Sequence, residues 1–195
     1  MKKISFYFLV IVLFGACKNH STGTANNQTD SSEKKNYFPV ASFIRDEISY
    51  VDSMPLGILK QTIINGQKDS GYIKSEEFHK LAQDFISPIF SSGDFEKDYT
   101  ETSFMDQTTE SVTFTYASKN KLQEVTRIDV LAKPGDSYIK VKSVYMEKVA
   151  NKNDTLITKK MFWKAKHNFQ VVTTTQPSGQ KPVIEQLKVV WDDSE

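Results

Sequence analysis

The chain has 195 residues, with 25 basic and 24 acidic side chains and a formal net charge of +1. A nearly neutral chain lacks the dense positive charge that binds nucleic acid or is strongly attracted to anionic lipid, which argues against both kinds of partner. Cys17 is its only cysteine, so the chain cannot form an internal disulfide.

The N-terminus has the pattern of a secretory signal. Lys2 and Lys3 precede an uncharged, mostly apolar run from Ile4 to Phe14. A bilayer-spanning helix needs about 20 such residues, whereas the apolar core of a signal peptide has about 7–15 and ends in small residues. Gly15 and Ala16 are those small residues. We therefore predict a signal peptide over residues 1–16.

The segment Leu13-Phe14-Gly15-Ala16-Cys17 resembles the lipobox of bacterial lipoproteins. The resemblance implies cleavage before Cys17, lipidation of its sulfur, and a membrane as partner through that N-terminal lipid. Lys18 stands where aspartate would favour the inner membrane, which points to the outer membrane. Since Lys18-Asn19-His20 is not acidic, we expect the periplasmic face. The composition of the chain also resembles that of uncharacterised small envelope lipoproteins of Bacteroidota, a likeness that implies no activity.

Residues 18–36 contain no large apolar side chain. Such a segment cannot bury enough surface to offset the entropy of ordering, so we predict a lipidated cysteine and disordered tether over residues 17–36. Residues 37–195 have a length typical of one domain and contain no second linker or internal repeat. We predict a single domain there.

The first part of that domain has helical spacing. Pro39 is favoured at a helix start, and Met54-Pro55 marks its end. Apolar residues recur between them at positions that share one helix face. Next, Ile58–Ile64 is rich in β-branched residues and Asn65-Gly66 signals a tight turn, which predicts a short strand or hairpin.

A second helix is predicted to begin at Ser75, as its N-cap, with Glu76 and Glu77 in the first turn. Pro88 and Gly93 mark its end. Its predicted apolar face consists of Phe78, Leu81, Ala82, Phe85 and Ile89.

From Phe95 onward the apolar period changes to two, and turn residues separate the alternating segments. Strands at this spacing indicate an antiparallel meander with one apolar and one wet face. Such a sheet twists and tends to curl. The expected fold class is therefore α+β: two N-terminal helices packed on a long curved antiparallel sheet of about six to seven strands.

No pattern of catalytic residues stands out. The domain has no Gly-x-Ser-x-Gly, no glycine-rich phosphate loop and no cysteine. Of the three histidines, His20 lies in the predicted tether, His167 in a predicted turn, and His79 in a helix three residues after Glu76. One Glu-x-x-His pair falls short of the four ligands of a structural metal site. We expect no metal, no cofactor and no enzymatic activity.

Lysines alternate with apolar residues between Lys160 and Lys166. On a strand this alternation places Lys160, Lys164 and Lys166 on one face. The favoured interpretation is a solvated face that discourages edge pairing, and the alternative is a patch for anionic groups.

These observations support the hypothesis of a membrane-anchored, non-enzymatic envelope lipoprotein that binds an apolar or lipid ligand under its sheet. The same residues that would line such a site are also explained as ordinary core. The alternative function is a structural or assembly subunit that docks onto an envelope protein complex. The candidate lining residues are Phe43, Phe78, Phe85, Trp163 and Trp191.

Overall fold

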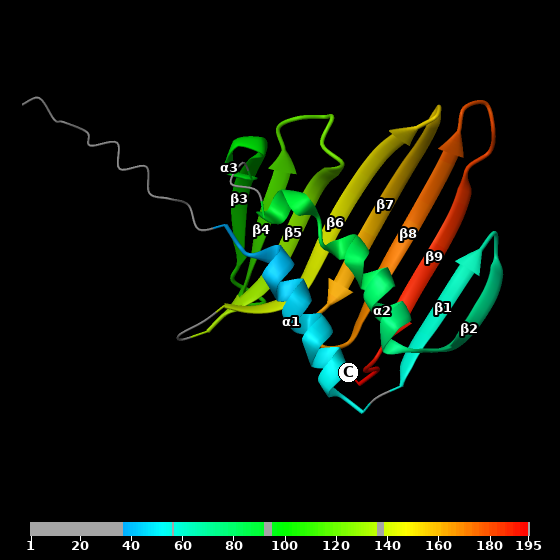
Figure 1. The fold of residues 1–195 in the computed structure, drawn as a ribbon. Helices are drawn as coiled ribbons and strands as arrows, with labels where there is room; N and C mark the ends of the chain where they lie inside the picture. Colours follow the sequence, from blue (N-terminus) through cyan, green and yellow to red (C-terminus); the bar gives the residue numbers. More distant parts are fainter. Residues whose placement is uncertain (1–36, 56, 92–94, 136–138, 195) are drawn as a thin grey trace, which may run out of the picture. The chain divides into compact units, whose positions relative to one another are not determined.

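The computed structural model describes residues 37–194 except 56, 92–94 and 136–138 (Figure 1). The predicted signal peptide, the lipidation of Cys17 and the tether over residues 17–36 lie outside the described residues. They stay predictions.

One antiparallel sheet of nine strands forms the larger layer of the described chain. Its strand order is β2-β1-β9-β8-β7-β6-β5-β4-β3. Each strand from β3 to β8 therefore pairs with the next along the chain, as in a meander. The strands are β1 (Ile58–Ile64), β2 (Gln67–Ile73), β3 (Tyr99–Asp106), β4 (Ser111–Ser118), β5 (Val125–Pro134), β6 (Ile139–Lys152), β7 (Thr155–Lys164), β8 (Asn168–Pro177) and β9 (Val183–Val190).

The α+β class and the antiparallel sheet are confirmed, but the predicted count of six to seven strands is wrong. The hairpin of β1 and β2 accounts for the difference, because β1 also pairs with β9 and so extends the sheet. Its turn is the predicted Asn65-Gly66, where both residues have positive φ, of 51° and 84°. An Asn-Gly turn of this kind matches the twist of a hairpin.

The prediction of an N-terminal pair of helices is also wrong, since the hairpin separates α1 (Val40–Ser53) from α2 (Ser75–Ala82). Helix α2 is shorter than predicted: Phe85 belongs to the 3₁₀ turn η1 (Gln83–Phe85), and Ile89 to the 3₁₀ turn η2 (Pro88–Ser91). A short helix α3 (Phe95–Asp98) leads into β3. No helix in the described ranges is long and apolar enough to cross a membrane.

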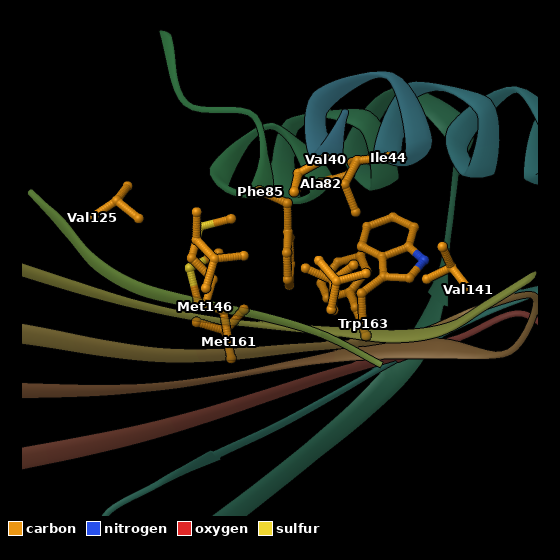
Figure 2. Close-up of a cluster of buried hydrophobic side chains, with 14 of the residues drawn as sticks. Val40, Ile44, Ala82, Phe85, Val125, Val141, Met146, Met161 and Trp163 are labelled. Carbon is orange, nitrogen blue, oxygen red and sulfur yellow. The ribbon is translucent and has the colours of Figure 1, made fainter. Parts of the chain in front are cut away.

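Helices α1 and α2 lie across the same face of the sheet, and the core fills the space between (Figures 1 and 2). Alternation along the strands sends one set of side chains into this core, as for Met146 on β6 and Met161 on β7, both completely buried. Figure 2 shows Val40 and Ile44 of α1 and Phe85 of η1 meeting them from the other side.

The centre of this core is aromatic. The ring of Trp163 stacks on Phe169 at 5.2 Å between centroids and meets the edge of Phe85 at 5.1 Å. Phe78 of α2 lies edge-on to Trp191 at 5.5 Å. Aromatic pairs in these offset and edge arrangements contribute about 0.5–1.5 kcal/mol each beyond their area burial. The aromatic cluster therefore packs α2 and η1 against the middle of the sheet.

Candidate functional site

A cleft of about 800 Å³ lies between the first half of α1, one end of strands β6 and β7, and the turn that follows β7. It is large enough for a small-molecule ligand, since such sites usually measure about 300–1,000 Å³. The cleft is lined by Phe38, Pro39, Ser42, Phe43, Asp46, Glu47, Ile139, Lys140, Val141, Lys142, Lys164, Ala165, Lys166, His167 and Asp192.

Part of the lining is apolar. The rings of Phe38 and Phe43 lie 6.1 Å apart and are both partly buried. On the sheet side, Val141 is nearly buried, whereas 48 % of Ile139 is exposed. The backbone N–H of Phe38 donates to the hydroxyl of Tyr116 at 3.1 Å, which holds the start of the helical segment against β4. The cleft therefore offers a partly exposed apolar surface on a fixed frame.

The wall made by α1 is held in place by a buried carboxylate, that of Glu47, whose residue is only 3 % exposed. It accepts hydrogen bonds from the indole Nε1–H of Trp163 at 3.2 Å and from the backbone N–H of Lys166 at 2.7 Å. The ammonium of Lys166 lies 3.2 Å from its other oxygen and 3.6 Å from the centre of the Tyr50 ring. A buried charge is tolerated when it is paired and hydrogen-bonded in this way.

The turn between β7 and β8 forms the opposite wall. Its residue Lys166 has a φ of 66°, and β7 ends at Lys164. The predicted alternation of three lysines on one face is therefore wrong for Lys166, which leaves the strand and turns toward α1. Neighbouring strands hold this turn, because Ala165 N–H donates to the carbonyl of Lys142 at 2.9 Å and Asp192 N–H donates to that of His167 at 3.2 Å.

Two lysines of β6 border the cleft, and neither forms an ion pair within the part of the chain that the structure describes. The register between β5 and β6 shifts so that Leu131 faces Ser143 but Ala132 faces Val141, which leaves Lys142 as a bulge residue. A bulge re-aims the side chain it carries. The ammonium groups of Lys140 and Lys142 make no hydrogen bond or ion pair with the residues that the structure describes, and both side chains are exposed.

The cleft is also lined by the polar residues His167 and Asp192. His167 is half-buried, and its Nδ1 has no hydrogen-bond partner among the described residues. The pKa of Asp192 is lowered, first by the backbone N–H and side chain of Ser194, and also by the nearby charges of His167 and Lys164. Asp192 is thus a carboxylate at neutral pH. A buried polar atom such as His167 Nδ1 requires a partner, which a bound ligand could supply.

The structure does not place the five predicted lining residues together. Phe43 lines the cleft. Phe78, Phe85, Trp163 and Trp191 lie in the packed core, with exposures of at most 3 %. Sequence reasoning missed Glu47, which lies in a charged stretch, and Lys140 and Lys142, which alternate with apolar residues; both patterns are typical of solvated surfaces.

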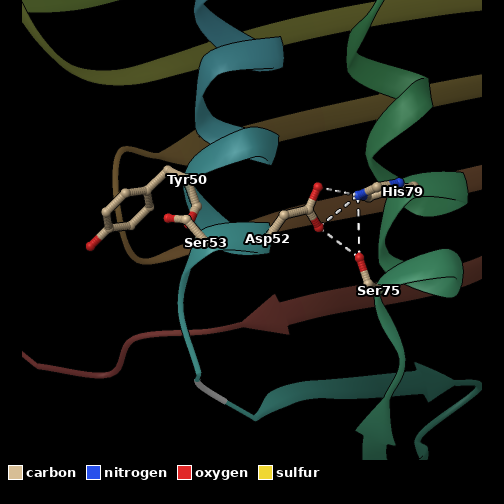
Figure 3. A network of polar contacts seen from close by, with 5 residues as sticks. All are labelled: Tyr50, Asp52, Ser53, Ser75 and His79. Carbon is tan, nitrogen blue, oxygen red and sulfur yellow. Dashed lines mark hydrogen bonds and ion pairs between the residues drawn. The ribbon is translucent and has the colours of Figure 1, made fainter.

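A serine, a histidine and an aspartate meet where the end of α1 faces the start of α2 (Figure 3). The Nε2 atom of His79 lies 2.9 Å from both carboxylate oxygens of Asp52 and 3.3 Å from Ser75 Oγ. The Ser75 hydroxyl donates to Asp52 at 2.6 Å. The N-cap of α2 is Lys74, whose side chain makes no capping hydrogen bond among the described residues, so the prediction of Ser75 as N-cap is wrong by one residue.

This contact, which we call the Asp52–His79 clamp, does not have the geometry of a catalytic triad. A triad needs the serine on one imidazole nitrogen and the carboxylate on the other, so that the histidine can move the serine proton. Here both partners meet the same nitrogen. The clamp instead joins two helix ends. Among the described residues, no three histidine, cysteine or acidic side chains are grouped so that they could hold a metal ion.

Comparison with known proteins finds no matching family model, no matching curated protein and no matching solved structure.

Replacing Glu47 with glutamine should lower the free energy of unfolding by about 1–3 kcal/mol, the usual cost of weakening buried, charge-assisted hydrogen bonds. Glutamine keeps the shape of the glutamate side chain but loses its ion pair with Lys166. Urea unfolding followed by tryptophan fluorescence measures the change. Asp46→Asn, on the exposed side of the same turn, is the matched control. An unchanged free energy in Glu47→Gln would show that this carboxylate does not fix α1.

The Asp52–His79 clamp should make stability depend on pH in the acid range. Burial raises the pKa of Asp52. The hydrogen bonds from Ser75 and His79 and the charge of His79 together lower this pKa by more than burial raises it, so the net shift is downward. Its stabilisation is then fully present above the pKa of aspartate in the unfolded chain and is lost as pH falls through the lower folded pKa.

The free-energy difference between the wild type and Asp52→Asn should therefore shrink on acidification. Because the Asp52 side chain is 38 % exposed, the difference at neutral pH should not exceed about 1 kcal/mol. Urea unfolding at a series of pH values measures it. Asp69→Asn, exposed on β2, controls for the loss of one negative charge. A difference that grows toward acid pH would contradict this role of Asp52.

Proposed function

We propose that the chain is a non-enzymatic, membrane-anchored envelope lipoprotein whose domain binds an anionic amphiphile in the cleft beside α1. The observation that carries the proposal is the juxtaposition of a partly exposed apolar wall with Lys140 and Lys142, which form no ion pair with the residues that the structure describes. In this arrangement the acyl chain contacts Phe38, Phe43 and Val141. The acidic head group lies at the β6 border.

The size of the cleft and its apolar wall support an acyl chain as the tail of this ligand. Each methylene removed from water contributes about 0.8 kcal/mol, so a short stretch of chain against Phe43 and Ile139 gives useful affinity. The core residues Phe78 and Phe85 both pack against Trp163, so the ligand is placed beside α1 rather than deep under the sheet.

Charge supports the acidic head group. Lys166 is engaged by Glu47 at 3.2 Å, and Lys164 lies near the carboxylate of Asp192. Lys140 and Lys142 are left with donors to offer. Charge-assisted hydrogen bonds from an ammonium to a carboxylate or phosphate are about twice as strong as neutral ones. Asp46 is the acidic residue of the lining whose charge opposes this preference.

The anchor part of the proposal rests on the lipobox-like segment Leu13–Cys17, which lies outside the described residues. Lipid on Cys17 would hold the domain at the outer membrane, on its periplasmic face. Stable anchoring needs about two acyl chains, and a lipoprotein of this kind would carry three. A binding domain held there would meet amphiphiles at the bilayer surface.

Ligand binding is tested by titrating the unlipidated Cys17→Ser chain with a dansyl-labelled fatty acid and following the blue shift of its fluorescence. Lysophosphatidic acid should displace the probe, and an uncharged monoacylglycerol should displace it less well. The double variant Lys140→Glu, Lys142→Glu should weaken binding about tenfold or more, because each lost charge-assisted bond is worth about 1.5–3 kcal/mol. Phe43→Gln should also weaken it.

The matched control for charge reversal is Lys68→Glu, Lys181→Glu, since both lysines are exposed and far from the cleft lining. Absence of saturable binding would refute the ligand proposal. Equal affinity for charged and uncharged competitors would refute the role of the lysines. Capture of an envelope protein at the cleft residues, with no amphiphile bound, would favour the alternative of an assembly subunit.

Lipidation is tested on the protein from native membranes. The N-terminal tryptic peptide should begin at Cys17 and carry the added mass of acyl chains in mass spectrometry. Cys17→Ser should move the protein from the membrane to the soluble fraction. A native chain that begins at Met1 with a free thiol would overturn the lipoprotein assignment and leave the cleft to be judged by itself.

A further inference from the structure

A second, smaller cavity lies on the helix-covered face of the sheet, at the other end of β6 and β7. Its volume is about 270 Å³. It contains none of the residues of the cleft, so a ligand bound in it does not depend on the proposed function. Its lining is unusually rich in charge for that face: Asp84, Glu124, Lys148, Ala150, Lys152, Ile157 and Lys159.

Lys148 is the buried member of this set, with only 9 % of the residue exposed. Its ammonium makes no hydrogen bond with any residue that the structure describes. The nearest carboxylate oxygen is that of Glu124, at 4.0 Å, and this glutamate side chain is 65 % exposed. A buried ammonium with so weak a partner loses much of its hydration without replacement.

A second ammonium lies beside it, because Lys148 of β6 faces Lys159 of β7 in the register of the sheet. Lys159 is paired with Asp84 of η1 at 2.5 Å between Nζ and the carboxylate oxygen. Asp84 is therefore engaged by Lys159. Lys152 lines the cavity as a third lysine and is exposed.

The electrostatics favour an added negative charge. Desolvation lowers the pKa of Lys148, the charges of Glu124 and Asp84 act against that shift, and the charge of Lys159 adds to it. The net shift is downward, which means that the cavity disfavours the charged form of Lys148. An anion between Lys148 and Lys159 would supply the missing hydrogen-bond acceptor and offset their mutual repulsion.

We propose that this cavity is a binding site for a small phosphate-type oxyanion, held between Lys148 and Lys159 with Lys152 at its border. The ammonium groups of Lys148 on β6 and Lys159 on β7 line one small space, and that of Lys152 lies at its rim. A phosphate group has enough oxygens to accept hydrogen bonds from all three. The class comprises inorganic phosphate and small phosphate monoesters. Phosphatidate head groups share the chemistry, but the burial of Lys148 favours the free anions.

The test is calorimetric titration of the full chain with inorganic phosphate and with glycerol phosphate at constant ionic strength. Saturable binding is expected. Lys148→Met should reduce the affinity about tenfold or more, the loss expected from one charge-assisted bond. Lys159→Met should reduce it as well, and Lys68→Met, an exposed lysine on β2, should leave it unchanged.

Folding of the key variant is checked by thermal unfolding. Lys148→Met should melt at or above the wild-type temperature, since replacing a poorly paired buried charge by an apolar side chain of similar volume is often neutral or stabilising. If Lys148→Met proves unstable, Lys152→Met replaces it in the test, because Lys152 is exposed. This variant should lose less affinity for phosphate than Lys148→Met, but the loss should still be measurable. Wild-type affinity in folded Lys148→Met would overturn the proposal, as would absence of saturable phosphate binding in the wild type.

The pH dependence gives a second readout. Above about pH 8 phosphate is already a dianion, so any further change in affinity reports the protein. Affinity should fall as pH rises through the lowered pKa of Lys148, and this fall should be absent in Lys148→Met. Vesicles of phosphatidylcholine with phosphatidate form a separate arm. Binding to them but to neither small phosphate would overturn the assignment to free anions. The cleft variant Lys140→Glu, Lys142→Glu should bind phosphate normally.

Discussion

The position of helix α1 depends on one buried negative charge. Burying a carboxylate is costly unless every direction around it is satisfied, and Glu47 meets that condition only where the indole N–H of Trp163 and the backbone N–H of Lys166 both reach it. Apolar contacts alone would let a helix slide or rotate on a sheet, because they have little directionality. The carboxylate removes that freedom, and with it sets the wall of the cleft.

The two cavities follow from a mismatch in length between the layers. Strand β6 has 14 residues and, at roughly 3.3 Å per residue, extends about 46 Å. Helix α1 also has 14 residues, but at 1.5 Å per residue it covers only about 21 Å. The aromatic core occupies the middle of the covered face, and both ends of β6 extend past it. Lys140 and Lys142 lie at one end, and Lys148 and Lys152 at the other, so each end can take a polar ligand.

Local patterns predicted most of the elements but not their long-range partners. The Asn65-Gly66 turn and the apolar alternation of the strands are short-range signals, and both gave correct elements. The pairing of β1 with β9 joins segments more than a hundred residues apart, and no local pattern encodes it. Glu47 follows two exposed charged residues and resembles them in sequence, because its partner Trp163 lies 116 positions away. Lys148 did carry a signal: it continues the inward alternation of Val144 and Met146.

The two buried charges between the helices and the sheet, Glu47 of α1 and Lys148 of β6, call for different explanations. Glu47 has three donors and orients a helix, so its burial is compensated within the fold. Lys148 has one distant carboxylate and a like charge opposite it, so its burial is not compensated by the described residues. A methionine there would fill similar space without the desolvation penalty, and the free energy of folding therefore gives no reason for an ammonium at this position. A bound anion that pairs with the Lys148 ammonium does give a reason for it. In the anion-bound state both buried charges, those of Glu47 and Lys148, are paired.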